Sequence, residues 1–141
     1  MNKKRMTDLM LKANEILESS GILQKDDHNQ WYIEESYNGQ TSSFGVTVAM
    51  SGLIPALVIF YQETSDNRKI DRKKILEAIG EMIKSDKPEW QIHDAKSLLE
   101  KALRRGINNE DLKKEIAVGL KKEVLECATA LKQIIRTYEL K

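Results

Sequence analysis

A long uncharged segment in an otherwise charge-rich chain places the strongest limit on the fold. No Asp, Glu, Lys or Arg occurs from Ser36 through Gln62, although these residues make up 32% of the 141. Within this segment, the run from Phe44 to Tyr61 is almost wholly apolar. A helix that is apolar on all sides belongs either at the centre of a protein or in a bilayer. The hydroxyl side chains that precede the run predict a helix N-cap at Thr41, Ser42 or Ser43.

The composition of the run favours a protein interior. Its length is close to the ~20 residues that a membrane span needs, but Gly45, Ser51 and Gly52 lower its hydrophobicity. Pro55 removes one backbone hydrogen bond, which predicts a kink or a break in the helix. The flanking segments are amphipathic and need a hydrophobic partner, which this run supplies. A membrane-associated protein anchored through residues 44–61 is the less favoured alternative.

The rest of the chain shows the spacing of amphipathic helices. The predicted helices are residues 3–19, residues 70–84, a segment capped by Ser85 and Asp86 that opens at Pro88 and stops at Gly106, and a segment capped by Asn108 or Asn109 that runs to the C-terminus. A break at Gly119 would divide the last one. Residues 21–40 are polar and predict a loop. We therefore expect a single all-α domain over residues 1–141, a compact bundle of five to six helices around a central apolar helix.

The charge and cysteine content restrict the setting of the protein. The chain has 23 basic and 22 acidic residues and a net charge of +1, so any contact with nucleic acid must come from local patches. Cys127 is the one cysteine and has no partner for an internal disulfide. No apolar run of the secretory type follows the basic N-terminus. These features predict a cytoplasmic protein.

No motif in the sequence predicts catalysis. The chain contains no glycine-rich phosphate loop, no nucleophile elbow and no cluster with the spacing of metal ligands. Cys127 falls on the apolar side of a predicted helix, where a buried small hydrophobic residue is far commoner than a nucleophile. His93 is expected to be a surface or capping residue. We therefore predict a protein that is not an enzyme and that needs neither a cofactor nor a metal.

Two groups of basic residues are candidates for binding RNA. The first is dense and lies at a turn that leads into a helix, where it would neutralise several phosphates: Arg68, Lys69, Arg72, Lys73 and Lys74. The alternative is a solvated helix start. A further cluster, Lys101, Arg104 and Arg105, lies at a helix C-terminus, where the helix dipole already favours cations.

The second group lies along the last predicted helix. At 100° per residue, Lys114, Lys121 and Lys132 fall within about 20° of one another, and Arg136 lies about 40° further round. The residues Glu115, Glu123 and Glu126 occupy the other flank, provided that the helix continues past Gly119. The basic stripe includes Val118 and Leu125, which suits a binding face better than plain solvent. Chance segregation of the charges is equally compatible with the pattern. Trp31 and Tyr32 would either stack on bases or cover the edge of the core.

The middle and the end of the chain resemble one known family. The stretch from Tyr37 to Tyr61 is similar to the central signature of the small subunit of type III-B CRISPR (Cmr) RNA-targeting complexes. Its recognisable pieces are Ser43-Phe44-Gly45, Ser51-Gly52-Leu53, Pro55-Ala56-Leu57 and Phe60-Tyr61. Residues 128–140 also resemble the terminal helix of that family.

The resemblance implies a helical protein without catalysis. In that family, several copies stack as a filament beside the backbone subunits of the complex. They help to hold the duplex of crRNA and target RNA through basic surfaces, in antiviral defence. The expected partners are therefore other Cmr subunits, further copies of the chain, crRNA and target RNA, with no membrane. The alternative is a helical protein–protein adaptor with no nucleic-acid role.

Overall fold

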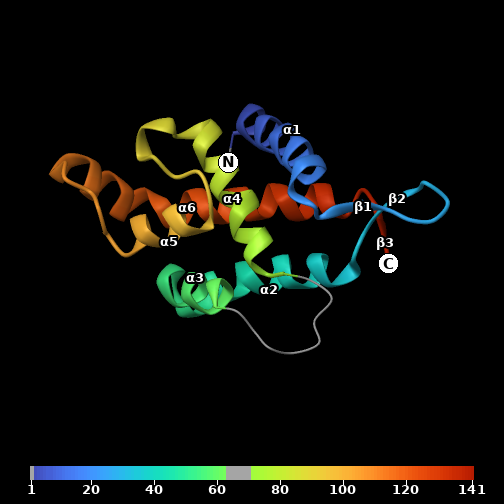
Figure 1. The fold of residues 1–141 in the computed structure, drawn as a ribbon. Coiled ribbons are helices and arrows are strands. Elements are labelled where there is room, and N and C mark those ends of the chain that lie inside the picture. The colour runs from blue at the N-terminus through green and yellow to red at the C-terminus, as the bar shows by residue number, and fades with distance from the viewer. Residues whose placement is uncertain (1, 63–70) are drawn as a thin grey trace.

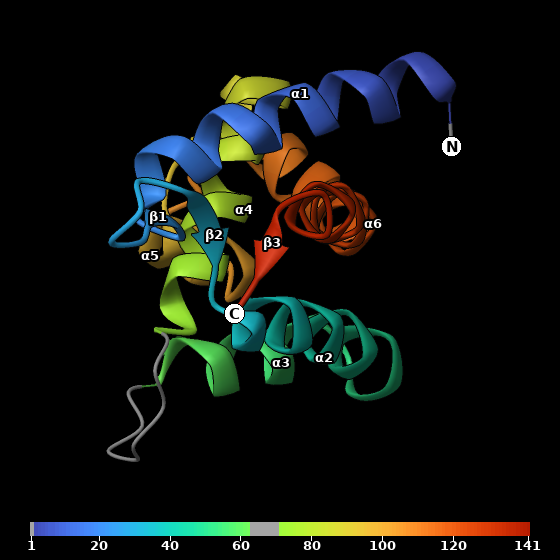
Figure 2. The ribbon, with the colours of Figure 1, turned by 90° about the vertical axis from the view of Figure 1, so that its right-hand side faces the viewer.

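The protein is a bundle of α-helices, as the sequence predicts. The computed structural model describes residues 2–62 and 71–141, and in these ranges it has six α-helices and one small sheet. The helices are α1 (Lys3–Ser20), α2 (Glu35–Ser51), α3 (Leu53–Tyr61), α4 (Lys73–Asp86), α5 (Ala95–Ala102) and α6 (Glu110–Ile135). The helix α6 runs through the middle, with α1 on one side and α2 on the other (Figure 1). Viewed nearly along α6, helices α1, α4 and α2 surround it and leave one side uncovered (Figure 2).

Helix α6 is continuous, so the predicted alternative of a break at Gly119 is wrong. A Cβ atom on Gly119 would lie 3.3 Å from the ring of Trp90, so this glycine allows the buried indole to pack against α6. The predicted N-cap is confirmed, because the side chain of Asn109 accepts a hydrogen bond of 3.1 Å from the backbone N–H of Leu112. Glu110 stands in the first turn, where the helix dipole favours an anion.

The uncharged segment forms two helices, so the predicted break in the helix is present, but the predicted N-cap and the predicted position of the break at Pro55 are wrong. The N-cap is not at Thr41, Ser42 or Ser43, because α2 already begins at Glu35 and the Thr41 hydroxyl donates to the carbonyl of Tyr37 within the helix. The break lies at Gly52, whose φ of 99° is accessible to glycine at little cost. Pro55 falls in the first turn of α3, where its missing N–H breaks no helical hydrogen bond.

This segment is also less enclosed than its composition predicts. One face is buried and includes Phe44, whose ring meets that of Phe60 edge-on at 5.1 Å between centroids. The other face is open to solvent, and Val46 and Met50 are 57% and 82% exposed. None of the helices in the described ranges is both long and apolar enough to span a membrane.

The predicted helix at Pro88 is replaced by a short 3₁₀ turn, η1 (Pro88–Trp90), and α5 begins only at Ala95. Asp94 caps α5 by accepting a hydrogen bond of 2.7 Å from the backbone N–H of Ser97, and the Ser97 hydroxyl completes a capping box. The backbone of Asp94 lies directly over Gly80 in α4, where a Cβ atom would be 2.7 Å from the Asp94 carbonyl oxygen. Glycine at position 80 therefore permits the close approach of α4 to the start of α5.

The predicted loop at residues 21–40 instead contains two strands and the start of α2. Strands β1 (Leu23–Lys25) and β2 (Trp31–Ile33) pair antiparallel, and β3 (Glu139–Leu140) adds to β2 in parallel. Asp26 holds the hairpin turn by accepting hydrogen bonds from the backbone N–H groups of His28 and Gln30. The strands are too short for an alternating pattern to be visible in the sequence.

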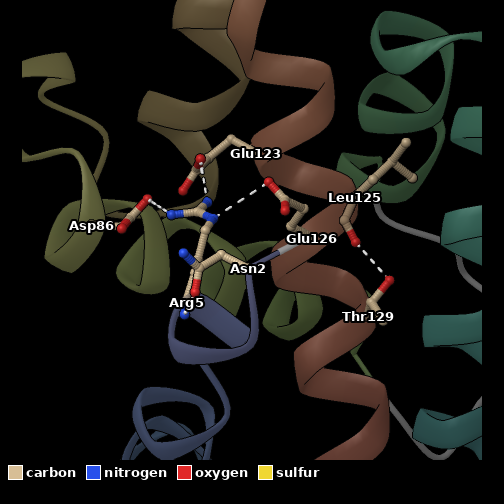
Figure 3. A network of polar contacts seen from close by, with 7 residues as sticks. All are labelled: Asn2, Arg5, Asp86, Glu123, Leu125, Glu126 and Thr129. Atoms are coloured by element: carbon tan, nitrogen blue, oxygen red, sulfur yellow. Dashed lines mark hydrogen bonds and ion pairs between the residues drawn. The ribbon is translucent and has the colours of Figure 1, made fainter. Parts of the chain in front are cut away.

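A part-buried charge cluster joins α1, α4 and α6 (Figure 3). The guanidinium of Arg5 donates hydrogen bonds of 2.6 Å to Asp86 and to Glu123, and its Nε lies 3.4 Å from Glu126. One cation therefore faces three carboxylates. Burial alone would lower the pKa of Arg5, but its bonds to Glu123 and Asp86 raise it. The cluster fixes the start of α1 against the middle of α6.

The surplus of carboxylates shifts the protonation of Glu123. Burial, reinforced by the neighbouring Asp86, raises the pKa of Glu123 from 4.5 to about 7, against the opposing effect of Arg5. The neighbouring Glu123, together with Arg5, lowers the pKa of Asp86, although its partial burial acts in the opposite direction. Among the described residues, Oε1 of Glu123 is a buried side-chain atom without a hydrogen-bond partner, whereas its Oε2 accepts from Arg5.

We expect Gly80→Ala to destabilise the protein by about 1–3 kcal/mol, because the new methyl group meets backbone that cannot move aside. Gly39→Ala is the matched control. Position 39 lies inside α2, and no atom stands within 4 Å of the place that an added methyl group would take, so alanine there should stabilise by about 0.5–1 kcal/mol. Urea unfolding of both variants measures the difference. If the two substitutions changed the free energy of unfolding by the same amount and in the same direction, the close contact at Gly80 would be contradicted.

We expect the stability to fall as the pH rises through 7, and Glu123→Gln to remove this loss. Because the folded-state pKa of Glu123 lies above 4.5, the stability it contributes is complete below pH 4.5, falls progressively as the pH approaches the folded-state value of about 7, and levels off above it. The loss amounts to about 2–3 kcal/mol between pH 5 and pH 8. Urea midpoints across this range measure it. Glu115→Gln, at an exposed position of the same helix, should keep the wild-type profile. A Glu123→Gln profile parallel to that of the wild type would count against the assignment.

Candidate nucleic-acid interface

A stripe of cations follows the uncovered side of α6. Lys114, Lys121 and Arg136 are exposed and Lys132 is half-buried. At 1.5 Å per residue, the stripe extends about 33 Å along the helix axis. Because α6 is unbroken at Gly119, the condition on which the predicted stripe depended is met. We call these four residues the basic stripe.

The acidic flank of α6 has a structural explanation that the sequence did not reveal. Two of its three carboxylates, Glu123 and Glu126, are buried against α1 and pair with Arg5. Only Glu115 is exposed. One feature of the sequence could have predicted this cluster. Glu123 and Glu126 are three residues apart beside the apolar face of the helix, so their burial requires a cation from another helix. The charges of α6 are segregated because the flank toward α1 holds an internal ion cluster.

The basic stripe borders two grooves. The first, of about 300 Å³, lies between α2 and α6 and has Val46, Leu125 and Lys132 in its walls. The second, of about 340 Å³, lies where α2, α3, the end of α5 and α6 meet, and we call it the junction groove. It is lined by Gly52, Leu53, Ile54, Pro55, Lys101, Ala102, Arg104, Ile116, Ala117, Leu120 and Lys121. Val118, which lies in the stripe, is 86% exposed. Apolar and cationic side chains are therefore mixed on this side of the molecule.

The other predicted RNA-binding cluster lies elsewhere. Arg68 and Lys69 fall outside the described residues. The guanidinium carbon of Arg72 lies 4.0 Å from the ring centroid of Phe60, and Nζ of Lys73 lies 4.5 Å from that of Tyr61. These contacts hold the start of α4 against the end of α3. Helix α4 begins on the side of the bundle away from the uncovered side of α6, so Arg72 and Lys73 do not join the basic stripe (Figure 2).

The two aromatic residues of the hairpin lie in a mixed environment. Trp31 is 49% exposed, with Nζ of Lys25 4.5 Å from its ring centroid. Tyr32 is half-buried and donates a hydrogen bond from its hydroxyl to Gln24. The adjacent surface also carries carboxylates, and Asp26 pairs with Lys141 at 2.6 Å. The carboxylates make this region a poorer site for phosphates than the basic stripe.

The two residues considered for chemistry are placed as the sequence predicted. Cys127 is fully buried, and burial raises the pKa of its thiol well above its usual value. His93 is exposed beside the N-cap of α5, with its Nε2 3.5 Å from the Asp94 carboxylate. Within residues 2–62 and 71–141, no group of three His, Cys, Asp or Glu side chains is arranged to hold a metal ion.

Comparison with known proteins identifies the family. A family model described as CRISPR-associated protein (Cas_Cmr5) matches residues 1–138, nearly the whole chain. No match was found among curated proteins or among solved structures. The resemblance of residues 37–61 and 128–140 is thereby confirmed. The chain belongs to the small-subunit family of the Cmr complexes of type III-B CRISPR systems.

Proposed function

We propose that this protein is the non-catalytic small subunit of a type III-B Cmr effector complex. Several copies stack as a filament beside the backbone subunits and help to hold the duplex of crRNA and target RNA during antiviral defence in the cytoplasm. The whole chain acts as one domain. Membership of the Cmr small-subunit family supports association with other Cmr subunits. The burial of Cys127, with its high thiol pKa, argues against a nucleophilic role for the one cysteine.

The observation that carries the RNA-binding role is the basic stripe. Its cations are spread over about 33 Å along one continuous helix, from Lys114 to the C-cap residue Arg136. A duplex has phosphates along its whole length, and a row of lysine and arginine side chains neutralises them without reading sequence. The near-neutral net charge is compatible with this role, because Glu123 and Glu126 on the opposite flank of α6 are internal and do not face the RNA.

We expect the triple variant Lys114→Ala, Lys132→Ala and Arg136→Ala to weaken target-RNA binding by the assembled complex. For every phosphate that is no longer neutralised, the slope of log K against log salt should fall by about 0.7–0.9. Lys84→Ala with Lys96→Ala, at exposed positions of α4 and α5, serves as the control and should keep the wild-type slope. Filter binding at several salt concentrations measures both. An unchanged slope in a complex that still contains the triple variant would refute the RNA-binding role of the stripe.

Arg68, Lys69, Arg72 and Lys73 form the second proposed RNA contact. The described pair, Arg72 and Lys73, lies against the aromatic rings of Phe60 and Tyr61. Reversing Arg68 and Lys69 to glutamate leaves those ring contacts intact. We expect the reversal to lower target-RNA affinity at low salt, and the same binding assay measures it. Wild-type affinity would restrict the RNA contacts to α6.

A helical adaptor without a nucleic-acid role is the alternative, and the exposed apolar residues Val46, Met50 and Val118 favour it. Purification of the tagged protein from its native host, with identification of the co-purifying RNA and proteins, separates the two functions. Recovery of crRNA with other Cmr subunits is expected. Recovery of an unrelated protein partner without RNA would replace the proposed function with the adaptor.

A further inference from the structure

We infer that the junction groove binds the outward face of α1 from a second copy of this chain. The inference rests on the proposed filament and goes further, because it assigns the two surfaces that meet. Two complementary surfaces carry it: an apolar groove with a cationic rim, and an acidic helix face with an apolar residue at its centre.

The junction groove combines apolar walls with a positive rim. Leu53, Ile54 and Ala117 supply apolar surface from two helices. Lys101, Arg104 and Lys121 supply the charges. Phosphates alone would not use the apolar walls, whereas an amphipathic helix would use both. The chemistry of the groove therefore selects an acidic helix that carries an exposed aliphatic side chain.

The outward face of α1 has this chemistry. Leu11 is 63% exposed and lies opposite the buried side of the helix, which carries Leu9, Ala13, Ile16 and Leu17. At 100° per residue, Asp8, Glu15 and Glu18 fall within about 60° of Leu11, and Asp8 and Glu18 are exposed on this face. The side chain of Glu15 is 70% exposed, and its carboxylate lies 3.3 Å from Nζ of Lys12 on the same helix. Lys4 is the cation on this face and stands in the first turn. From position 8 onward, this face carries three carboxylates, of which Glu15 is paired with Lys12, around one large apolar side chain.

The positions of the two surfaces favour a growing row over a closed pair. Helix α1 lies on one side of the bundle, and α2 and α3 lie on the opposite side, with α4 and α6 between them (Figures 1 and 2). A contact between two different patches is heterologous, so a pair of copies still has one groove free at one end and one α1 face free at the other. Successive copies can therefore be added without a new kind of contact. Their net charge of +1 gives little repulsion between them.

Charge exchange between the two surfaces tests the contact. We expect Lys101→Glu with Lys121→Glu to lower the self-association constant at least tenfold, and Glu15→Lys with Glu18→Lys to do the same. An equimolar mixture of the two variants should recover association, because each groove then meets an α1 face of opposite charge. Lys84→Glu with Lys96→Glu makes the same change in net charge on α4 and α5 and should associate like the wild type. Sedimentation velocity at low salt measures all four samples. No recovery in the mixture would overturn the pairing.

Cross-linking in the assembled complex is the second test and does not depend on the affinity of the isolated protein. A variant carrying Leu11→Cys and Ile54→Cys should give a ladder of multimers with a short bis-maleimide, whereas each single variant gives no ladder beyond a dimer. The native Cys127 is buried and should not react. A complex that contains the double variant but gives no ladder would overturn this inference and leave the proposed function intact. A wild-type chain that never enters a Cmr complex would instead refute the proposed function.

Discussion

The burial of α6 against its neighbours organises every other element of the protein. Its apolar side chains include Ile116, Leu120, Val124 and Leu131, all buried, and they contact helices from both halves of the chain. Burying each such side chain contributes about 1.5–3 kcal/mol. Helices α1, α2 and α4 each bury one face and expose the other, and each is stabilised by packing its buried face against α6. Three neighbours occupy most of its circumference, and the remaining side becomes the surface available for binding.

The Arg5 cluster adds polar contacts to this packing, and these contacts fix the position of α1 relative to α6. Replacing a buried ion pair by apolar residues is often harmless, but removing one partner leaves charge without compensation. Arg5 faces three carboxylates from two helices, so its position specifies where the first turn of α1 lies along α6. The same contacts bury the acidic flank of α6. The lysines of the opposite flank are thereby kept apart from these carboxylates, which is a requirement for a phosphate-binding surface.

The uncharged segment has a second role that follows from its position at the outside of the bundle. Its inner face joins the core through Phe44, Val48 and Leu57, whereas its outer face presents Val46 and Met50 to solvent. An exposed apolar surface next to cations is compatible with the proposed contacts to both proteins and RNA. The low net charge is therefore the sum of surfaces with different chemistry: an acidic face on α1, a basic stripe on α6 and a neutral face on α2.

Local sequence was sufficient to predict the helical class, the extent of α1 and the cap and first turn of α6. It also predicted that Cys127 is buried and that cations line one side of α6. These features depend on periodicity and on residues close in the chain. Local sequence also carried the family resemblance. The packing of distant segments was needed to show that Gly119 continues α6, since its role is to accommodate Trp90, and that Gly80 allows Asp94 to approach. The three strands required pairing between the hairpin and the C-terminus, and the Arg5 cluster joins residues more than 80 positions apart. Such contacts leave no periodic signal, because they depend on how the helices pack and not on the order of residues within any one of them.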